Sequence, residues 1–275
     1  MLGAIVGDIV GSPFEFDRNR NTAYSKNYPL VSDASCFTDD TVMTLAVADA
    51  LMCSMPHKGD KTSEAEFKHY VIKSMRSFAG VYPNAGYGHN FSKWLRTPGN
   101  PQPYNSWGNG SAMRVSPVAW AFDNLEDVER YAAVSSRVTH NNPEGIRGAK
   151  ATASAIFLAR TGKTKNEIKH YISEKYYYDL SRSLDDIRPH YHHVESCQKT
   201  VPEAITAFLE GENFEDVLRS AVSLSGDADT LTAIAASIAE GFYGIPEEIS
   251  RLIIPKLGDF LMGSLTKWEI WRREA

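Results

Sequence analysis

Two short stretches of the sequence each place a pair of aspartates and a threonine at the start of an apolar segment. Both groups carry hard oxygen atoms of the kind that bind divalent cations. Aspartate and threonine are also good helix caps, so capping explains either stretch about equally well when it is taken alone. Neighbouring carboxylates repel each other, however, and are costly to bury unless they are paired or bind a metal. The residues are Thr38, Asp39 and Asp40 in the first stretch, and Asp227, Asp229 and Thr230 in the second.

The presence of two such stretches in one chain favours metal binding over capping. If they face each other in the fold, four carboxylates and two hydroxyls could hold two ions, which would activate water and orient the oxygens of a substrate. The spacing does not match an EF-hand loop, which disfavours a plain calcium site. A group of three histidines offers zinc binding as a weaker alternative, because its spacing fits no strong zinc pattern. These are His190, His192 and His193.

Three other stretches carry polar residues that could complete such a site. Glu15 follows Asp8 in a Ser-Pro turn, where it could act as an acid, a base or a ligand, and a surface turn with solvated acids is the alternative. The Gly-Asn-Gly-Ser turn at 108–111 offers backbone N–H groups to an anion, although a plain loop is the more common explanation. His140 precedes a predicted helix and suits contact with phosphate or ribose, unless it is a structural histidine.

The composition is typical of a soluble globular protein. Hydrophobic residues make up 43% and charged residues 23% of the 275 positions, and the formal net charge is −5. An acidic chain disfavours general binding to nucleic acid or to a membrane surface. Three scattered cysteines without a CxxC pair indicate a reducing compartment, and the N-terminal stretch is a poor signal peptide, so we expect a cytoplasmic protein.

Apolar periodicity predicts helices along most of the chain, whereas alternating β-type runs are scarce. No apolar run is long enough to span a bilayer. The sequence therefore predicts one all-α domain over residues 1–275, and we expect a monomer. The predicted helices span 40–52, 64–78, 125–138, 143–160, 201–209, 214–224 and 231–242, and the predicted loops span 17–35, 97–110 and 182–193.

Five stretches, taken in order, resemble the ADP-ribosylglycohydrolase family, which includes the ADP-ribosyl-acceptor hydrolases and the dinitrogenase-reductase-activating glycohydrolases. They are GAIVGDIVGSPFE, FTDDTVMTLAVADAL, GNGSAMRVSPV, THNNPEGIRGA and SGDADTLTAIAASIAEGFYG, and together they reach to about Pro246. The Thr-Asp-Asp and Asp-x-Asp-Thr motifs in this order are highly specific. One departure is Ser225, which stands where the family often has the first glycine of Gly-Gly-Asp.

The resemblance implies an all-α orthogonal helical fold with two Mg²⁺ ions, or Mn²⁺ instead, in a cleft. Glu15 would lie on a flexible segment near the metal ions. By motif match, the metal ligands would be Thr38, Asp39, Asp40, Asp227, Asp229 and Thr230. The pocket for ADP-ribose would be lined by Gly108, Asn109, Gly110, Ser111, Met113 and His140, with Tyr104 or Trp107 as candidates to stack on adenine.

The reaction implied by the resemblance is hydrolysis of the bond between ADP-ribose and a protein or a small-molecule acceptor. Asp39 or Asp40 would orient and deprotonate the attacking water. Because nearby cations lower the pKa of a carboxyl group, Glu15 is the better candidate for protonating the leaving group. Arginine N-glycosides are the first expectation for the acceptor, and O-linked acceptors such as serine or O-acetyl-ADP-ribose are the second.

Two further classes of protein share parts of this pattern. One is a non-catalytic ADP-ribose-binding or immunity protein, which would tend to lose one or more of the acids. The other is a metal-dependent phosphohydrolase, which would use the same oxygen ligands without the Gly-Asn-Gly-Ser pocket. All of the acids are present in this chain, and the sequence therefore favours an enzyme.

Overall fold

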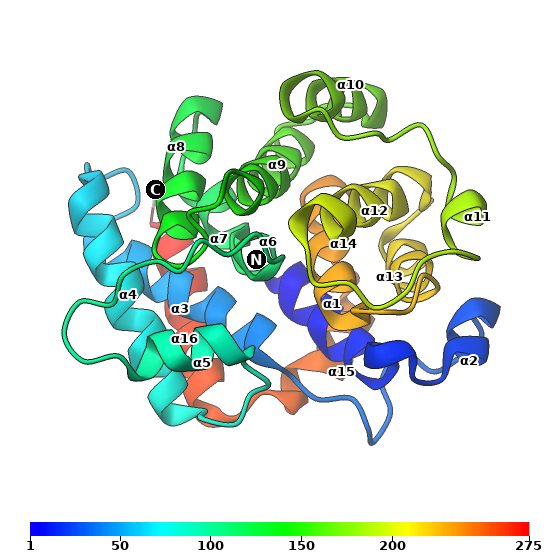
Figure 1. Ribbon diagram of the computed structural model, residues 1–275, viewed down its shortest axis with the longest axis horizontal. Helices are drawn as coiled ribbons and strands as arrows, with labels where there is room; N and C mark the ends of the chain where they lie inside the picture. The colour runs from blue at the N-terminus through cyan, green and yellow to red at the C-terminus, as the bar shows by residue number, and fades with distance from the viewer. Residues whose placement is uncertain (275) are drawn as a thin grey trace.

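The computed structural model describes residues 1–274, and within them the chain is all-α, as the sequence predicts. Extended pairing in this part of the chain is limited to an isolated antiparallel bridge between Gly108 and Ser196. Figure 1 shows α1 (Leu2–Gly11) and α14 (Ala228–Tyr243) side by side near the centre. The other elements are η1 (Ser12–Asp17), α2 (Arg20–Ser25), α3 (Asp39–Ser54), α4 (Glu64–Val81), α5 (His89–Arg96), α6 (Gly110–Met113), α7 (Ser116–Ala121), α8 (Leu125–Arg137), α9 (Pro143–Arg160), α10 (Lys165–Tyr176), α11 (Leu184–Ile187), α12 (Cys197–Glu210), α13 (Phe214–Val222), α15 (Glu247–Ile253), η2 (Ile254–Lys256) and α16 (Asp259–Arg273).

Helices α1 and α14 run antiparallel and pack backbone to backbone. Three glycines with a four-residue spacing, Gly3, Gly7 and Gly11, form the contact face of α1. A Cβ atom added at Gly7 would lie 2.3 Å from the carbonyl oxygen of Thr232, and one at Gly11 would lie 2.4 Å from that of Ala228. Only glycine permits such an approach. The packing therefore places the C-terminal end of α1 beside the N-terminal end of α14.

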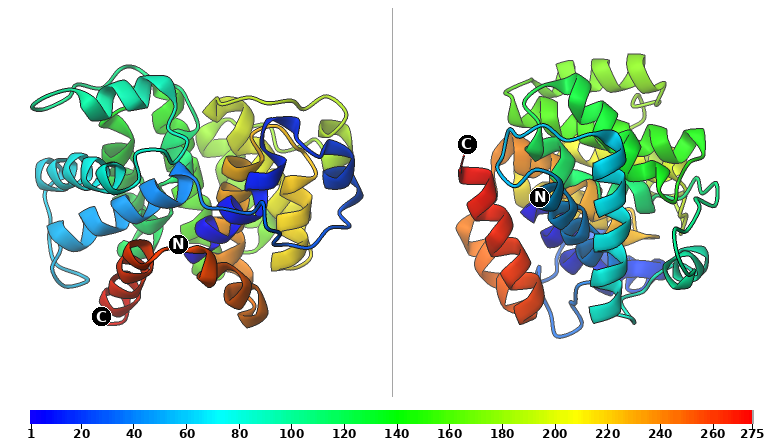
Figure 2. Two further views of the ribbon diagram at one scale, coloured as in Figure 1. Left: turned by 90° about the horizontal axis from the view of Figure 1, so that it is seen from below. Right: turned by 90° about the vertical axis from the view of Figure 1, so that its left-hand side faces the viewer.

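The core is built on two helices that are buried on nearly all sides, α14 and α3. Leu231, Ile234 and Ile238 of α14 are fully buried, and α14 packs against α9, α12 and α13 as well as α1. Helix α3 packs against α1, α4, α7 and α16, and Figure 2 (left) shows α16 on the opposite side of the molecule from the segment that contains α5. Because α1 touches both core helices, it holds their N-terminal ends close together.

The predicted helices are confirmed, with differences at their ends. Helix α9 begins at Pro143 and ends at Arg160, as predicted. Helix α12 begins at Cys197, before the predicted start at residue 201. Pro202, a residue type that favours helix starts, lies inside the helix. The predicted loops at 17–35 and 182–193 contain the short helices α2 and α11.

Helix α1 is not predicted by the sequence pattern, and neither are α5, α10, α15 and α16. The glycines of α1 disfavour a helix by local propensity, and contact with α14 overrides that preference. No helix within residues 1–274 combines the length and the apolar character needed to cross a membrane.

Candidate active site

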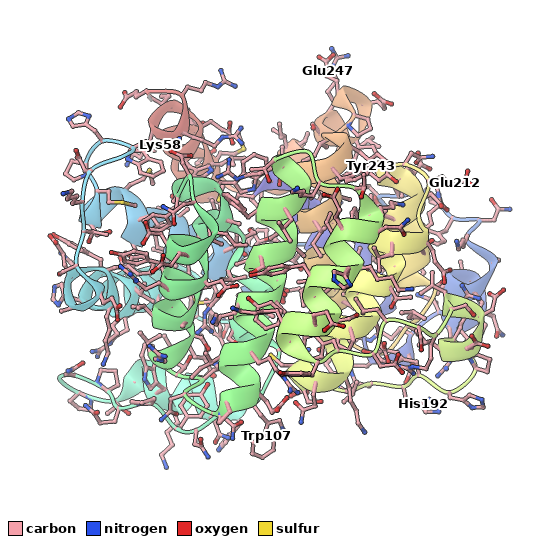
Figure 3. All side chains as sticks on the ribbon, turned by 90° about the horizontal axis from the view of Figure 1, so that it is seen from above. Lys58, Trp107, His192, Glu212, Tyr243 and Glu247 are labelled. Carbon is pink, nitrogen blue, oxygen red and sulfur yellow. The ribbon has the colours of Figure 1, made fainter. Side chains whose placement is uncertain are left out.

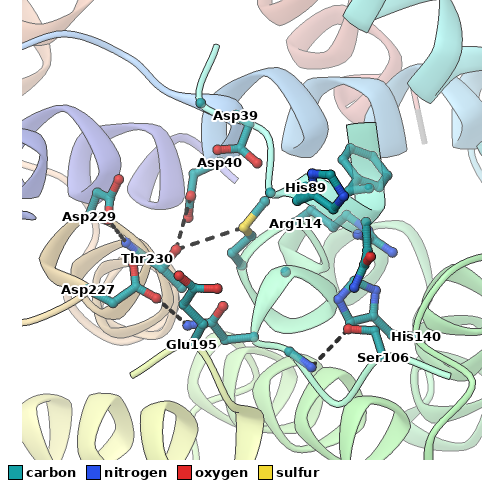
Figure 4. Close-up of a pocket in the computed structure, with 18 of the residues that line it drawn as sticks. Asp39, Asp40, His89, Ser106, Arg114, His140, Glu195, Asp227, Asp229 and Thr230 are labelled. Carbon is teal, nitrogen blue, oxygen red and sulfur yellow. Dashed lines mark hydrogen bonds between the residues drawn. The ribbon is translucent and has the colours of Figure 1, made fainter. Parts of the chain in front are cut away.

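The two acidic stretches meet at one cavity of about 340 Å³. Figure 4 shows the aspartates on one side of this cavity and Ser106, Arg114 and His140 on the other. The walls come from the N-terminal ends of α3, α5, α6 and α14, from η1, and from the loops that precede α5, α6, α9 and α12. Residues that line it are Glu15, Phe16, Asp39, Asp40, Gly86, Gly88, His89, Asn90, Phe91, Tyr104, Ser106, Gly108, Asn109, Gly110, Met113, Arg114, His140, His193, Glu195, Asp227, Asp229 and Thr230.

At the α3 end, the helix is capped by residues other than the two adjacent aspartates. Asp8 of α1 accepts hydrogen bonds from the backbone N–H groups of Thr38 and Thr41, at 2.9 and 3.0 Å, and from both threonine hydroxyls. The Thr38 hydroxyl in turn accepts from the backbone N–H of Asp40. Since Thr38 and Asp8 accept the N–H groups of Asp40 and Thr41, the side chains of Asp39 and Asp40 are not needed to cap the helix.

At the α14 end, the aspartates are held by side chains from elsewhere in the fold. The Asn109 amide donates to Asp227 and also lies 3.1 Å from the Thr200 hydroxyl. The Thr230 hydroxyl donates to Asp40 Oδ2 over 3.1 Å, which ties the start of α14 directly to the start of α3. Asp227 is the N-cap residue of α14, yet its side chain makes no capping hydrogen bond.

Six carboxyl groups share this small region, and burial is the main cause of their raised pKa values. The pKa of Glu15 is raised to about 7 by burial and by the charge of Asp227. The pKa of Asp39 is raised to about 8 by burial and by the charges of Asp8 and Asp227. The pKa values of Asp8, Asp40, Asp227 and Asp229 are also raised, with burial the main cause in each case.

The donor set fits divalent cations. Asp40 Oδ1 is buried and has no hydrogen-bond partner, which is the state expected of an oxygen that binds an ion. Glu15, Asp227 and Asp229 each bring one oxygen within 4.8 Å of the others, and so do Asp8, Asp40 and Asp229. Because the oxygens of Asp8 are engaged by the start of α3, Asp40 and Asp229 are the available ligands in the second group. Asp229 belongs to both groups.

The opposite side of the cavity combines a buried cation with aromatic and imidazole rings. Arg114 is 1% exposed, and burial lowers its pKa to about 10, so its guanidinium stays charged at neutral pH. It is the sole arginine or lysine among the lining residues of the described chain. Burial and the charge of Arg114 lower the pKa of His140 well below its usual value, so His140 is neutral. Tyr104 lies 6.0 Å from His140, measured between ring centroids.

Most of the predicted site residues line the cavity, but two lie behind its wall. Thr38 is set back and bonded to Asp8. Ser111 is fully buried, and its hydroxyl donates to the carbonyl of Gly145 over 2.8 Å. Trp107 is 55% exposed and is absent from the described lining, whereas Tyr104 is part of it.

Two of the predicted anion-binding N–H groups already have partners within the protein. The Gly108 N–H donates to the Ser106 hydroxyl over 3.1 Å, and the Asn109 N–H donates to the carbonyl of Glu195 over 2.8 Å. The N–H groups of Gly110 and Ser111 carry no recorded partner within residues 1–274. The backbone contribution of the turn to anion binding is therefore smaller than its sequence indicates.

Several residues of the site are not predicted by the sequence pattern. Asp8 is fully buried, so the alternative of a surface turn with solvated acids is wrong for this residue, and its position between glycines is the only sequence signal. Arg114 lies within the GNGSAMRVSPV stretch but is not among the predicted site residues, and Phe16 and Glu195 lie outside the five motif stretches, yet all three line the cavity.

The histidine group does not form a zinc site. His192 Nδ1 lies 2.9 Å from the Arg20 guanidinium, whereas His193 Nε2 lies 3.1 Å from a carboxylate oxygen of Glu195. In the described residues, no group of side chains close enough to share an ion includes a histidine. The two rings have separate partners, which leaves the carboxylates as the candidate metal ligands.

Comparisons with known proteins agree with this geometry. The family model of ADP-ribosylglycohydrolase matches residues 1–264. ADP-ribosylhydrolase ARH3 of Homo sapiens is 24% identical over 319 aligned residues, covering 90% of this chain and 85% of the relative. ADP-ribosylarginine hydrolase Tri1 of Pseudomonas putida is 28% identical over 281 aligned residues, covering 92% and 72% respectively.

The fold also has a solved counterpart. A structure described as an ADP-ribosylglycohydrolase-related protein complex matches with a TM-score of 0.70 and 21% identity, over 100% of this chain and 96% of the other. At this identity the likeness concerns the fold alone. Together with the family match over nearly the whole sequence, the paired acids at the cavity show that the chain belongs to the ADP-ribosylglycohydrolase family and is a hydrolase of glycosidic bonds to ADP-ribose.

Proposed function

We propose that this enzyme removes ADP-ribose from modified arginine side chains by cleaving the N-glycosidic bond. The observation that carries the proposal is the meeting of the two acidic stretches at one cavity, with the buried and partnerless Asp40 Oδ1 among them. The hydroxyl-rich distal ribose would lie against these acids. The diphosphate would lie toward the buried guanidinium of Arg114, the one permanent cation of the described lining.

The cofactor would be two Mg²⁺ ions, with Mn²⁺ as the alternative. When bound, the ions supply Lewis-acid chemistry and lower the pKa of water. Hard divalent cations favour carboxylate and hydroxyl oxygens, which are the donors present. The residues that would hold the ions are Thr38, Asp39, Asp40, Asp227, Asp229 and Thr230.

The protein side chains would divide the proton transfers between them. Asp39 or Asp40 orients the attacking water and takes its proton as the water oxygen bonds to the anomeric carbon. The bond from that carbon to the guanidino nitrogen breaks through an oxocarbenium-like transition state, and the nitrogen keeps the electron pair. Glu15, half-buried and with a pKa of about 7, supplies a proton to the departing nitrogen. A carboxyl group that titrates near neutral pH can both give and recover this proton.

The nucleotide end of the cavity would bind the rest of ADP-ribose. Tyr104 is the lining aromatic that could stack on adenine beside the neutral imidazole of His140. Ser111 would act from behind the wall by fixing the turn to the carbonyl of Gly145. The pocket residues of this proposal are Gly108, Asn109, Gly110, Ser111, Met113 and His140.

The arginine linkage is favoured by one relative and by the charge of the cavity mouth. Tri1, at 28% identity, is named an ADP-ribosylarginine hydrolase. The carboxylates of Glu15 and Glu195 both line the cavity, and the Glu195 side chain is 71% exposed, so they could complement a cationic acceptor. O-linked acceptors such as serine or O-acetyl-ADP-ribose are the second candidate, and the same assay separates them.

The test is release of ADP-ribose from an arginine-linked peptide, with a serine-linked peptide assayed in parallel. We expect release that requires Mg²⁺, is abolished by EDTA and is lost in Asp39→Ala. Asp33→Ala, which removes an exposed aspartate from a loop, serves as the control and should retain full activity. Release from the serine-linked peptide alone would contradict the arginine assignment. Binding of ADP-ribose without any release would contradict catalysis.

We further propose that residues 1–275 form a single domain that acts as a monomer and has no nucleic-acid partner. The net charge of −5 supports the last point. Its three cysteines are free thiols, which supports a cytoplasmic location because disulfides are rare in reducing compartments.

A further inference from the structure

The open end of the cavity carries three side chains in contact with one another, from two segments far apart in the sequence. The ring of Phe16 lies 4.8 Å from that of His193, between centroids and at 35°, and His193 Nε2 lies 3.1 Å from Glu195 Oε1. All three line the cavity. We propose that Phe16 and Glu195 are the acceptor-binding residues and that they select a guanidinium group. This inference rests on the proposed hydrolysis and concerns the part of the site that binds the acceptor.

Glu195 is rigidly placed although its side chain is exposed. The carbonyl of Glu195 accepts a hydrogen bond from the Asn109 N–H over 2.8 Å. The next residues are fixed as well, because Ser196 pairs with Gly108 and the Cys197 N–H donates to the carbonyl of Trp107 over 3.0 Å. The Glu195 side chain is 71% exposed, and one carboxylate oxygen faces His193. The other oxygen has no recorded partner within residues 1–274 and is available to a ligand.

Phe16 presents an aromatic surface that contacts His193, the partner of this carboxylate. It is 52% exposed, which is unusual for a phenylalanine next to a buried site. Its backbone is in the left-handed region at φ 56°, as is that of Asp17 at φ 58°. Such conformations are costly for residues other than glycine and concentrate at functional sites. The backbone here turns the ring outward, away from the apolar core, and toward His193.

The chain itself places a guanidinium over this ring. The central guanidinium carbon of Arg18 lies 5.2 Å from the centroid of Phe16, which is within cation–π range. Arg18 is exposed and forms no ion pair among the described residues. Arg18 thus marks a position that a substrate guanidinium could occupy.

The location also fits the acceptor rather than the nucleotide. A modified side chain on a folded protein must enter from an open end, and its anomeric carbon must reach the acids. Phe16 and Glu195 are exposed, and Phe16 directly follows Glu15 in the chain. At the nucleotide end, Arg114 and His140 are 1% and 5% exposed. Figure 4 shows Glu195 on the same side of the cavity as Asp227, away from His140.

A guanidinium group can bind favourably to both Phe16 and Glu195, whereas a serine hydroxyl gains no comparable binding energy from either residue. The planar cation can stack on Phe16 and donate N–H hydrogen bonds to the carboxylate of Glu195. As the bond to the anomeric carbon breaks, the guanidino nitrogen retains the electron pair and takes up a proton, and the product is the free guanidinium. A cation-binding subsite therefore stabilises the product side of the reaction only when the acceptor is arginine.

The experiment compares matched peptides and matched variants of the Mg²⁺-loaded enzyme. Two peptides of the same sequence carry ADP-ribose on arginine or on serine, and kcat/KM is measured for wild type, Glu195→Gln and Phe16→Leu. For the arginine-linked peptide we expect a loss of about 10-fold for Glu195→Gln and about 5-fold for Phe16→Leu. Hydrolysis of the serine-linked peptide should stay within about 2-fold of wild type for both variants, because neutral acceptors gain little from these residues.

Glu212→Gln is the control for removal of a negative charge. Glu212 lies at the opposite edge of the molecule from Trp107, whose backbone adjoins the Glu195 segment (Figure 3). This variant should leave both peptides unaffected. Equal losses on the two peptides for Glu195→Gln and Phe16→Leu would overturn the proposal, because they would show a structural role. Unchanged rates on the arginine-linked peptide would overturn it as well.

A binding measurement separates this inference from the proposed hydrolysis. Agmatine, which carries a guanidinium, is titrated into the Mg²⁺-loaded protein with ADP-ribose present, and N-acetylserinamide serves as the neutral comparison. We expect agmatine to shift the NMR signals of Phe16 and Glu195, and Glu195→Gln to abolish the shift. Agmatine binding without turnover of either peptide would support the subsite and contradict the hydrolysis. Turnover without agmatine binding would contradict the subsite alone.

Discussion

The N-terminal ends of α3 and α14 carry nearly the same residues but are held in place differently. At α3, the carboxylate of Asp8, from another helix, accepts hydrogen bonds from the first turn and leaves Asp39 and Asp40 free. At α14, the side chain of the N-cap residue Asp227 makes no capping hydrogen bond and is instead held by the Asn109 amide. One end is supported by a buried carboxylate within the core, and the other by a loop that also forms the cavity wall.

The backbones that lead into the two helices differ in the same way. Thr38 enters α3 in an extended conformation that any residue adopts. Ser225 and Gly226 enter α14 with φ angles of 63° and 75°, both left-handed. A Cβ atom on Gly226 would also lie 2.9 Å from the carbonyl oxygen of His192. The α14 end is therefore a strained turn against a loop, whereas the α3 end is a well-capped helix start.

Because of this difference, we expect the N-terminal ends of α3 and α14 to contribute differently to the stability of the fold. Both supply carboxylates to one site, so both should matter equally for chemistry. Only the α3 end depends on a buried charged group in the core, so damage to its support should also unfold the protein. Damage to the support of α14 should act on the site and leave the fold nearly intact.

The largest expected effect tests whether the two ends are equivalent in chemistry. Asp40→Asn removes a charge at α3, and Asp229→Asn removes one at α14. Each should lower kcat on an ADP-ribosylated peptide by about 10³-fold, in line with the loss of a group that binds a catalytic cation. Isothermal titration with Mg²⁺ should show weaker binding in both. A loss confined to one variant would mean that a single ion, held at one end, performs the chemistry.

The second prediction separates the supports of the two ends. Asp8→Asn turns an amide N–H₂ toward donors of α3 and leaves buried N–H and hydroxyl groups without an acceptor. We expect a loss of about 3 kcal/mol in the free energy of unfolding, with activity lost as well. Asn109→Ala removes the donor to Asp227 and should lower kcat by about 10- to 100-fold, as is usual for residues that orient metal ligands. Its cost in stability should be about 1 kcal/mol.

Urea denaturation and steady-state kinetics on the same preparations measure both quantities. Asn124→Ala, which removes a helix cap of α8 far from the site, is the control for a plain capping loss of about 1 kcal/mol with unchanged kcat. If Asp8→Asn cost no more stability than this control, the α3 end would not depend on its buried carboxylate. If Asn109→Ala kept full activity, Asp227 would need no outside support.

The helices with a clear apolar period could be predicted from the sequence, whereas the residues that support their N-terminal ends could not. Periodic apolar residues and the Asn142-Pro143 start predict α9 to the residue. The acids of both stretches stand out because paired carboxylates beside apolar helices are costly without a partner. Helix α1 could not be predicted because Gly3, Gly7 and Gly11 disfavour a helix by local propensity. Their role is close contact with α14, and a local sequence pattern does not indicate such a contact.

The roles of residues that act through a partner far away in the chain could not be predicted from the sequence either. Asp8 looks like an acid in a glycine-rich turn, and its role depends on α3, which begins some thirty positions later. Ser111 belongs to the family motif, yet its hydroxyl faces Gly145 rather than the cavity. Phe16 becomes a neighbour of His193, which contacts Glu195, only when η1 meets the loop that precedes α12. The spacing of residues along the chain does not indicate these tertiary contacts.

The smallest expected effect is a pH dependence of the folding stability, which arises from carboxyl groups near both helix ends. In the folded chain without metal, the pKa of Glu15 is about 7 and that of Asp39 is about 8, each above the value of about 4 for an unfolded chain. A raised folded pKa means that the folded state binds the proton more tightly than the unfolded state. The stability that these groups contribute is therefore full below about pH 4 and is lost as the pH rises through 7 and 8.

Divalent ions should reverse this loss, because they replace the protons as partners of the carboxylates. Thermal unfolding with and without MgCl₂ should show a gain in Tm that is larger at pH 8 than at pH 5, by roughly 3 °C, or about 1 kcal/mol for a chain of this size. Asp229→Asn should remove most of the difference, because Asp229 belongs to both carboxylate groups. The same gain at both pH values would show that the ions do not compete with protons for these acids, and the carboxylates of α3 and α14 would then not be their ligands.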